Sequence, residues 1–202
     1  MTRWLLSLVL AVGLASPVRA ADPRNPDWPC QQVKVPELSA AAVWAGPPLD
    51  DIGRTWEDDA KVKDLVARLA ARRLPLEEAQ KTAADFLAVS GDAKRAQARL
   101  VFAGLFATLD RLRSEVINGI ERYTRRQREF AGQVRANTLK LREMQDAPNA
   151  DPKQVEELAE KVQWDTRIFE ERRQTINYVC EVPVLIEQRL FALGRTIQEA
   201  ME

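Results

Sequence analysis

Apolar residues recur every three or four positions over two long stretches of the chain, which is the spacing of one face of an α-helix. The first series is Leu105, Leu109, Leu112, Val116, Ile120, Tyr123, Gln127, Phe130, Val134, Asn137, Leu141 and Met144. The second is Val155, Leu158, Val162, Asp165, Phe169, Arg172, Ile176, Val179, Pro183, Ile186, Leu190, Leu193 and Ile197. Asp92 is a plausible N-cap for the first helix, and Asp151 followed by Pro152 suits the start of the second. The pattern therefore predicts two very long helices over 92–202, with a turn near 147–151.

The two series match layer by layer when the second helix is folded back on the first. Met144 then lies opposite Val155, and Leu109 lies opposite Leu190. This agreement predicts an all-α fold built on a long antiparallel coiled-coil hairpin. Consecutive spacings of four, at 112, 116 and 120, fall opposite Pro183 and beside Gly119, which predicts a bend shared by both helices. The bend is either a packing accommodation or a working hinge.

Shorter elements precede the hairpin. Thr55 and Asp58 resemble a capping box at the start of a short helix, and Pro75 opens a second helix that stops at Gly91. We expect the helices of 55–91 to pack on one end of the hairpin and complete a four-helix base. Residues 21–54 contain six prolines and two tryptophans, which predicts an extended, docked strap that forms one domain with the helices.

The N-terminus resembles a targeting segment. Residues 1–20 combine Arg3, an apolar stretch and a small-residue cleavage site, which predicts a signal peptide and a periplasmic location. Cys30 and Cys180 are the two cysteines of the chain, and in an oxidising compartment they predict one disulfide. We expect this bond to tie the strap to the return helix near Ile120 and Val179. A redox role for the pair is the alternative.

Composition excludes many kinds of chemistry. The chain has no histidine, and its 30 basic residues balance its 30 acidic residues. Histidine-dependent nucleophilic catalysis and histidine-ligated metals are therefore excluded, and the neutral charge argues against nucleic acid as a partner. The acidic cluster Asp50, Asp51, Glu57, Asp58 and Asp59 lacks the spacing of a calcium loop. We expect no enzymatic activity, no catalytic residues, no metal and no cofactor.

The tip half of the hairpin differs from its base. Its seam contains Gln127 opposite Arg172 and Val134 opposite Asp165, so we expect a thin, wet, two-stranded arm. Three apolar residues lie on or beside its outer faces, and we predict that they contact a partner: Trp164, Ile168 and Leu139. The alternative is that Trp164 lies flat along the coil beneath arginine side chains.

The two helices of the arm have opposite charge biases. Residues 121–146 carry seven basic and four acidic residues, whereas residues 151–173 carry seven acidic and five basic residues. Ion pairs across the hairpin are the expected explanation, which makes a membrane surface an unlikely partner.

The sequence thus predicts a non-enzymatic exported scaffold or adaptor. Its arm would engage another envelope protein or a second copy. An alternative is a sensor or carrier that binds a small ligand in the base, in a cavity near Phe106, Ile117, Leu185 and Phe191. A disulfide-containing redox accessory protein is a further alternative.

Overall fold

The computed structural model describes residues 24–202, so the predicted signal peptide lies outside the described residues. The described chain is mostly helical, and no strand occurs within residues 24–202. Its α-helices are α1 (Ala60–Ala70), α2 (Leu76–Ala88), α3 (Lys94–Asp146) and α4 (Pro152–Met201). Single 3-10 turns occur at Ala40–Ala42, Thr55–Glu57 and Gly91–Ala93. The predicted helical class, with two short helices followed by two long ones, is confirmed.

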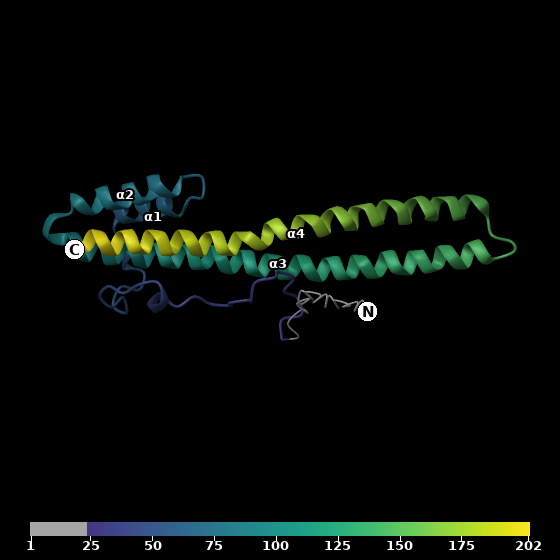
Figure 1. The fold of residues 1–202 in the computed structure, drawn as a ribbon, viewed down its shortest axis with the longest axis horizontal. Helices are drawn as coiled ribbons and strands as arrows, with labels where there is room; N and C mark the ends of the chain where they lie inside the picture. The colour runs from purple at the N-terminus through teal and green to yellow at the C-terminus, as the bar shows by residue number, and fades with distance from the viewer. Residues whose placement is uncertain (1–23) are drawn as a thin grey trace, which may run out of the picture.

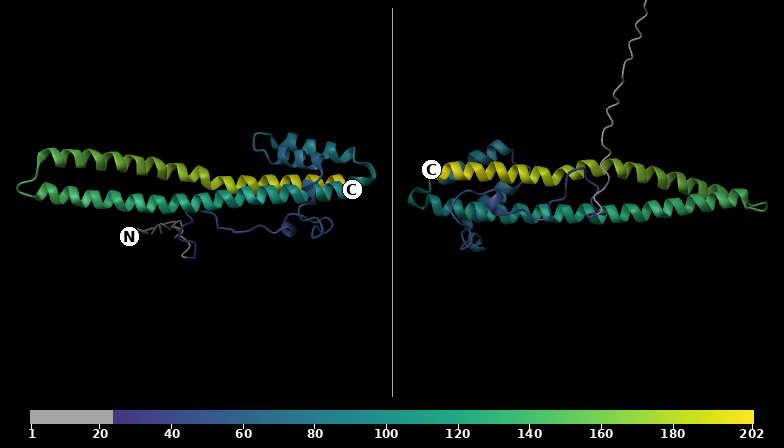
Figure 2. Two further views of the ribbon diagram at one scale, coloured as in Figure 1. Left: turned by 180° about the vertical axis from the view of Figure 1, so that it is seen from behind. Right: turned by 60° about the horizontal axis from the view of Figure 1, so that its bottom comes forward.

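The long helices α3 and α4 lie side by side and run in opposite directions (Figure 1). With 53 residues, α3 is about 80 Å long at 1.5 Å per residue. At one end, α1 packs on α3 and α2 packs on α4. We call this end the base and the uncovered residues 121–175 the arm. The strap lies on the opposite side of the α3 and α4 pair from α1 and α2 (Figures 1 and 2).

The ends of the helices follow capping chemistry. Asp151 accepts a hydrogen bond from the backbone N–H of Lys153, and Pro152 is the first residue of α4, as predicted. The proposed capping box at Thr55 is wrong, because Thr55 belongs to a 3-10 turn and α1 begins only after Asp59. Asp59 accepts hydrogen bonds from the N–H groups of Lys61 and Val62, and the bond from Val62 is the main cause of its lowered pKa. Asp92 is likewise not a cap, since α3 follows Ala93 without a side-chain cap.

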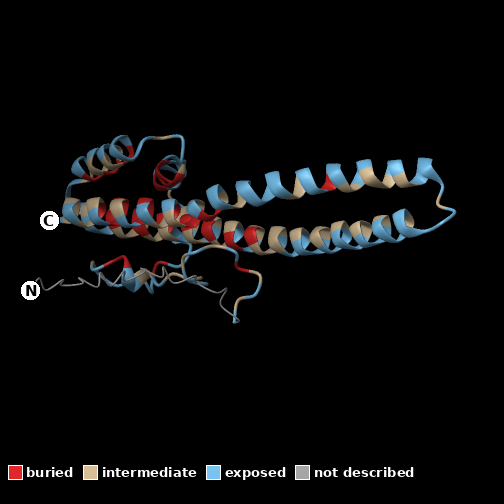
Figure 3. Ribbon diagram, turned by 45° about the vertical axis from the view of Figure 1, so that its right-hand side comes forward, coloured by how far each residue is buried: buried red, intermediate tan, exposed pale blue. Residues whose placement is uncertain are grey.

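The main hydrophobic core lies in the base. Residues of all four helices contribute to it, and the following are at most 1% exposed: Val62, Val66, Leu69, Ala79, Ala83, Leu87, Ala98, Val101, Phe102, Leu105, Leu109, Leu190, Leu193 and Ile197. The strap adds Trp44, whose ring stacks on Phe102 with centroids 4.3 Å apart. Figure 3 shows buried positions concentrated at this end of the long helices. Trp28 and Trp44 are each 7% exposed, so both tryptophans of the strap are docked as expected.

Glycines allow close packing at two points in the base. A Cβ atom placed on Gly104 of α3 would lie 2.7 Å from the ring of Trp56 and 2.9 Å from Val66. One placed on Gly194 of α4 would lie 3.0 Å from Phe102. A Cβ on Gly132, further along α3, would meet nothing within 4 Å. The glycine at 104 is therefore required by packing, whereas the glycine at 132 is not.

This difference predicts opposite effects of one substitution on the same helix. Gly104→Ala should lower the free energy of unfolding by about 1–3 kcal/mol, because the methyl group overpacks the contact with Trp56. Gly132→Ala should raise the free energy of unfolding by about 0.5–1 kcal/mol, because alanine is the better helix former at an open site. Urea denaturation followed by circular dichroism measures both. A destabilising effect at both positions would show that the arm packs as tightly as the base.

Candidate functional site

The outer surface of the arm exposes large apolar side chains. Trp164 is 61% exposed and Leu139 is 52% exposed, so neither belongs to the core, while Ile168 is half-buried beside the seam. Of the arm residues, all of which the structure describes, only Asp165 is buried. The arm is therefore a thin pair of helices, as expected. No contact in the structure tests the predicted role of these residues in binding a partner.

Tyr178 is an exposed aromatic residue that the sequence analysis missed. It is 74% exposed and lies 14 residues after Trp164 on α4, and Leu185, seven residues further on, is 53% exposed. Fourteen residues are four turns of helix to within about 40°, so Tyr178 lies on the same side of α4 as Trp164. The spacing of seven residues between Tyr178 and Leu185 indicates a shared helix face. This face was not recognised, because Tyr178 lies next to Val179 of the apolar seam.

The ion pairs expected between the two helices of the arm are not formed within the described chain. Pairs along α4 join Lys153 to Glu157, Lys161 to Asp165 and Arg173 to Glu170. On α3, Arg125 and Arg128 pair with Asp27 of the strap. The expectation that the opposite charge biases cancel across the hairpin is therefore wrong. Within the arm, the exposed basic residues of α3 that remain without an ion pair to the described chain are Arg122, Arg126, Arg135, Lys140 and Arg142.

Polar residues form direct links between α3 and α4 where the arm leaves the base. The hydroxyl of Tyr123 donates a hydrogen bond to the carbonyl oxygen of Arg172, at 3.0 Å, and its pKa is raised by burial. The guanidinium carbon of Arg172 lies 5.2 Å from the centroid of the Phe130 ring, a cation–π contact. Gln127, predicted opposite Arg172, lines a small cavity together with Tyr123 and Arg172, and its buried Oε1 has no hydrogen-bond partner. These side chains make the junction polar but leave the helices in contact.

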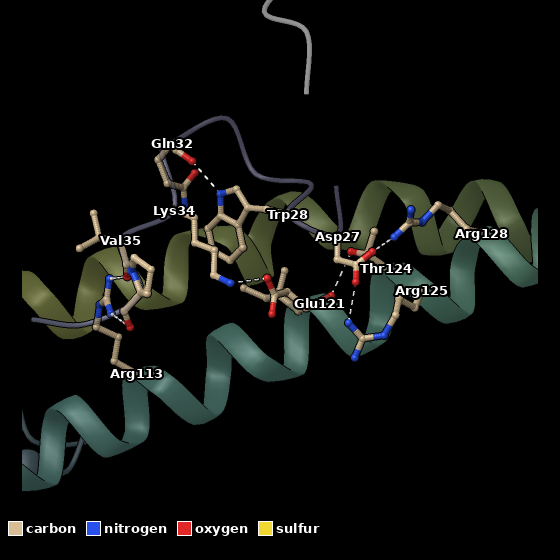
Figure 4. Close-up of polar contacts among 12 residues, drawn as sticks. Asp27, Trp28, Gln32, Lys34, Val35, Arg113, Glu121, Thr124, Arg125 and Arg128 are labelled. Carbon is tan, nitrogen blue, oxygen red and sulfur yellow. Dashed lines mark hydrogen bonds and ion pairs between the residues drawn. The ribbon is translucent and has the colours of Figure 1, made fainter. Parts of the chain in front are cut away.

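The strap is held at this junction by a disulfide and a buried tryptophan. Cys30 and Cys180 are bonded, with Cα atoms 5.5 Å apart, as predicted. Trp28 packs on Ile117 and Ile120 of α3, next to Val179, which confirms the expected layer. The indole N–H of Trp28 donates to the carbonyl oxygen of Gln32 at 2.7 Å, so the one polar group of this buried ring is satisfied (Figure 4).

Arg113 connects the strap to both long helices. Its side chain on α3 is 2% exposed, its Nε donates to Glu187 of α4 at 2.5 Å, and Nη2 donates to the carbonyl oxygen of Val35 at 2.5 Å. Nearby, the ammonium group of Lys34 pairs with Glu121 at 2.5 Å (Figure 4). Because these bonds use backbone oxygens and charged groups of an extended segment, they fix the strap along its length rather than at one point.

The predicted bend falls near this junction. Pro183 is buried inside α4 and has no N–H group to donate to Val179. In Figure 1, α4 changes direction near its middle, and its N-terminal part in the arm lies further from α3 than its C-terminal part in the base. On α3, a Cβ atom on Gly119 would meet only Arg122, at 3.9 Å, so no close contact requires a glycine there. A role for these two residues as a hinge stays a prediction.

The base contains a cleft that differs from the cavity expected there. About 490 Å³ in volume, it lies between the end of α1, the start of α2, and the facing sides of α3 and α4. Leu185 lines this cleft, but Phe106, Ile117 and Phe191 do not. Phe106 instead packs against the main core, and Ile117 packs beneath Trp28.

No cluster of three or more acidic or cysteine side chains within residues 24–202 could hold a metal ion. Within the same residues, no helix is both long and apolar enough to cross a membrane.

No family model matches the chain, and no curated protein and no solved structure matches it either.

The disulfide should contribute more to stability than the ion pairs of the strap. Replacing both cysteines, Cys30→Ser with Cys180→Ser, should lower the free energy of unfolding by about 2–5 kcal/mol, because the bond closes a very long loop in the unfolded chain. Amide hydrogen exchange should quicken in the strap while Leu190 and its neighbours stay protected. Asp27→Asn is the control: it removes two ion pairs whose arginine partners are exposed to solvent, so it should cost less than about 1 kcal/mol. Equal losses for the two variants would place the attachment in the ion pairs.

Proposed function

We propose that the chain is a non-enzymatic, exported scaffold or adaptor whose arm engages another envelope protein or a second copy of itself. The observation that carries this proposal is the exposure of Trp164 and Leu139 on the arm, away from the ion pairs that the strap forms near the base with Glu121, Arg125 and Arg128. A rod held away from the base gains little stability from an exposed indole, whereas aromatic side chains are frequent anchors of protein interfaces. The base and the strap would then serve to hold the arm in place.

The proposed arm is an antiparallel coiled coil in the register inferred from the two apolar series. Three cross-helix contacts support it: Arg113 with Glu187, Tyr123 with Arg172, and Phe130 with Arg172. Each pair lies within one helical turn of the positions that this register places opposite each other. Half-buried residues in the arm, among them Val134, Leu141, Val155 and Leu158, also belong to the two series.

A periplasmic location is part of the proposal. It is supported by the signal-peptide pattern of residues 1–20 and by the disulfide, which is compatible with an oxidising compartment. The partner would be an envelope protein for the same reason.

Charge favours self-association as one form of this function. Exposed bases of α3 in the arm and exposed acids of α4 such as Glu156 and Glu171 are not paired with each other inside one chain. If two arms lie antiparallel, α3 of one copy can face α4 of the other, so opposite charges meet. The apolar side of α4 that carries Trp164 would supply the area buried between the copies.

The function is tested by Trp164→Ala. Because the indole is exposed, the substitution should leave helicity and melting temperature nearly unchanged. It should weaken self-association or partner capture at least tenfold, about 1.4 kcal/mol. Sedimentation equilibrium measures the first and capture of periplasmic proteins by the immobilised chain measures the second.

Two variants give this test its controls. Val89→Ala removes an exposed apolar side chain, 85% exposed, at the base, and should change neither property. Leu109→Ala should lower stability by about 2–5 kcal/mol through the cavity it leaves, with normal affinity in the folded fraction. If Trp164→Ala leaves both association and capture unchanged, the arm is not the interaction surface.

The register is tested separately by crosslinking. In a chain without the native cysteines, Leu109→Cys with Leu190→Cys should form an intramolecular disulfide readily, because facing seam residues lie within bonding reach. Leu109→Cys with Ile176→Cys is two heptads out of register, about 20 Å by helical rise, and should not crosslink. Non-reducing electrophoresis and mass spectrometry read the result. The reverse pattern would place the helices in another register.

A further inference from the structure

The cleft in the base has apolar walls. They consist of Ala70, Leu76, Leu109, Leu112, Val116, Val182, Leu185 and Ile186. Its volume of about 490 Å³ lies within the range of about 300–1,000 Å³ typical of small-molecule sites. Two leucines of the wall have a large fraction of their surface exposed to solvent: Leu76 is 37% exposed and Leu185 is 53% exposed. An apolar chain in the cleft would remove both from water.

The same cleft is lined by Arg189, a buried cation without a carboxylate partner among the described residues. The residue is 8% exposed. Its Nε donates to the carbonyl oxygen of Leu69 at 2.7 Å and its Nη1 to that of Leu74 at 3.0 Å. Its Nη2 is buried and has no hydrogen-bond partner, and burial lowers the pKa of the guanidinium. Within the described chain this buried cation lacks a counter-charge, and one of its nitrogens lacks an acceptor, which is costly unless a ligand supplies the negative charge.

The other charges at the cleft leave it positive. Arg72 is exposed at its edge and forms no ion pair within the described chain. Glu115 is the one acidic residue of the lining, and Arg111 pairs with it at 2.7 Å. Gln188 is neutral. With Glu115 already paired, Arg189 and Arg72 are the charges left to attract an anion.

We propose that this cleft binds a single-chain amphiphile with a carboxylate head group, such as a medium-chain fatty acid. The carboxylate is attracted by the guanidinium of Arg189, which lines the cleft, and by Arg72 at its edge. The alkyl chain lies against Leu112, Val116 and Leu185. This activity belongs to the base and is independent of the function proposed for the arm.

The proposal is tested by isothermal titration calorimetry of the oxidised protein with dodecanoate, below the concentration at which it forms micelles. Dodecyltrimethylammonium and dodecanol have the same chain with a cationic and a neutral head. Dodecanoate should bind at least tenfold more tightly than either, because only its head group complements Arg189. Equal affinity for the three, or no binding of dodecanoate, would overturn the proposal.

Variants locate the site. Leu185→Ser should weaken dodecanoate binding about fivefold, since it removes an exposed wall residue on which the fold does not depend. Phe191→Ser is the matched control: Phe191 is also exposed on α4, at 43%, but does not line the cleft, so affinity should be unchanged. If both variants weaken binding equally, or neither does, the ligand is not in this cleft.

The head-group contact is tested by the ratio of dodecanoate to dodecanol affinity. Arg189→Gln should reduce this ratio at least tenfold, and because it is a ratio it does not depend on the folded fraction. Arg72→Gln, at an exposed position, should reduce it about threefold without affecting folding. An unchanged ratio in both variants would show that the arginines do not recognise the carboxylate.

Discussion

The pairing of α3 with α4 inside the base is the contact on which the other parts of the molecule depend. Leu105, Leu109, Leu190 and Leu193 are almost fully removed from water there, and truncating one such leucine costs about 2–5 kcal/mol. The arm has no comparable core, since its seam is only half-buried and includes polar side chains. Its helices are held side by side largely because the base fixes where each begins and in which direction it runs. Loss of packing in the base would therefore disorganise the arm, whereas loss of the arm's exposed side chains would leave the base intact.

The strap adds a second constraint on the position of α3 relative to α4. It acts at the junction of base and arm, where α1 and α2 no longer pack on the long helices. Arg113, the disulfide and Trp28 act within a short length of the hairpin, and together they join the strap to both long helices. This arrangement compensates for a weakness of the same region, because Pro183 removes a backbone hydrogen bond from α4 there. Because the strap is bound to both long helices near Pro183, it limits how far the two helices can separate there.

Periodicity was sufficient to predict the helices but not their surroundings. The turn at 147–151 and the cap at Asp151 follow from local chemistry, so they were predictable, and the cysteine pair was predictable because the chain offers one pairing. The start of α1 was misplaced because Thr55, Asp58 and Asp59 all suit a cap, and tertiary contacts of Trp56 decide among them. The cleft was misplaced because its position depends on how α2 crosses α4, which no periodic pattern encodes. The environment of Arg189 was not predictable, since nothing near it in the chain indicates that its partners are carbonyl groups at the end of α1 and in the loop that follows.

The disulfide joins residues separated by 150 positions. During synthesis Cys30 leaves the ribosome long before Cys180, so its only intramolecular partner does not exist until most of α4 has been made. A thiol that waits in this way is exposed to other thiols and to oxidants for the whole interval. Folding of the hairpin brings Cys180 beside the strap, which favours closure of the bond. Oxidation of this pair therefore cannot precede synthesis of α4 up to Cys180, and chains that lack this part of the second long helix cannot form the bond.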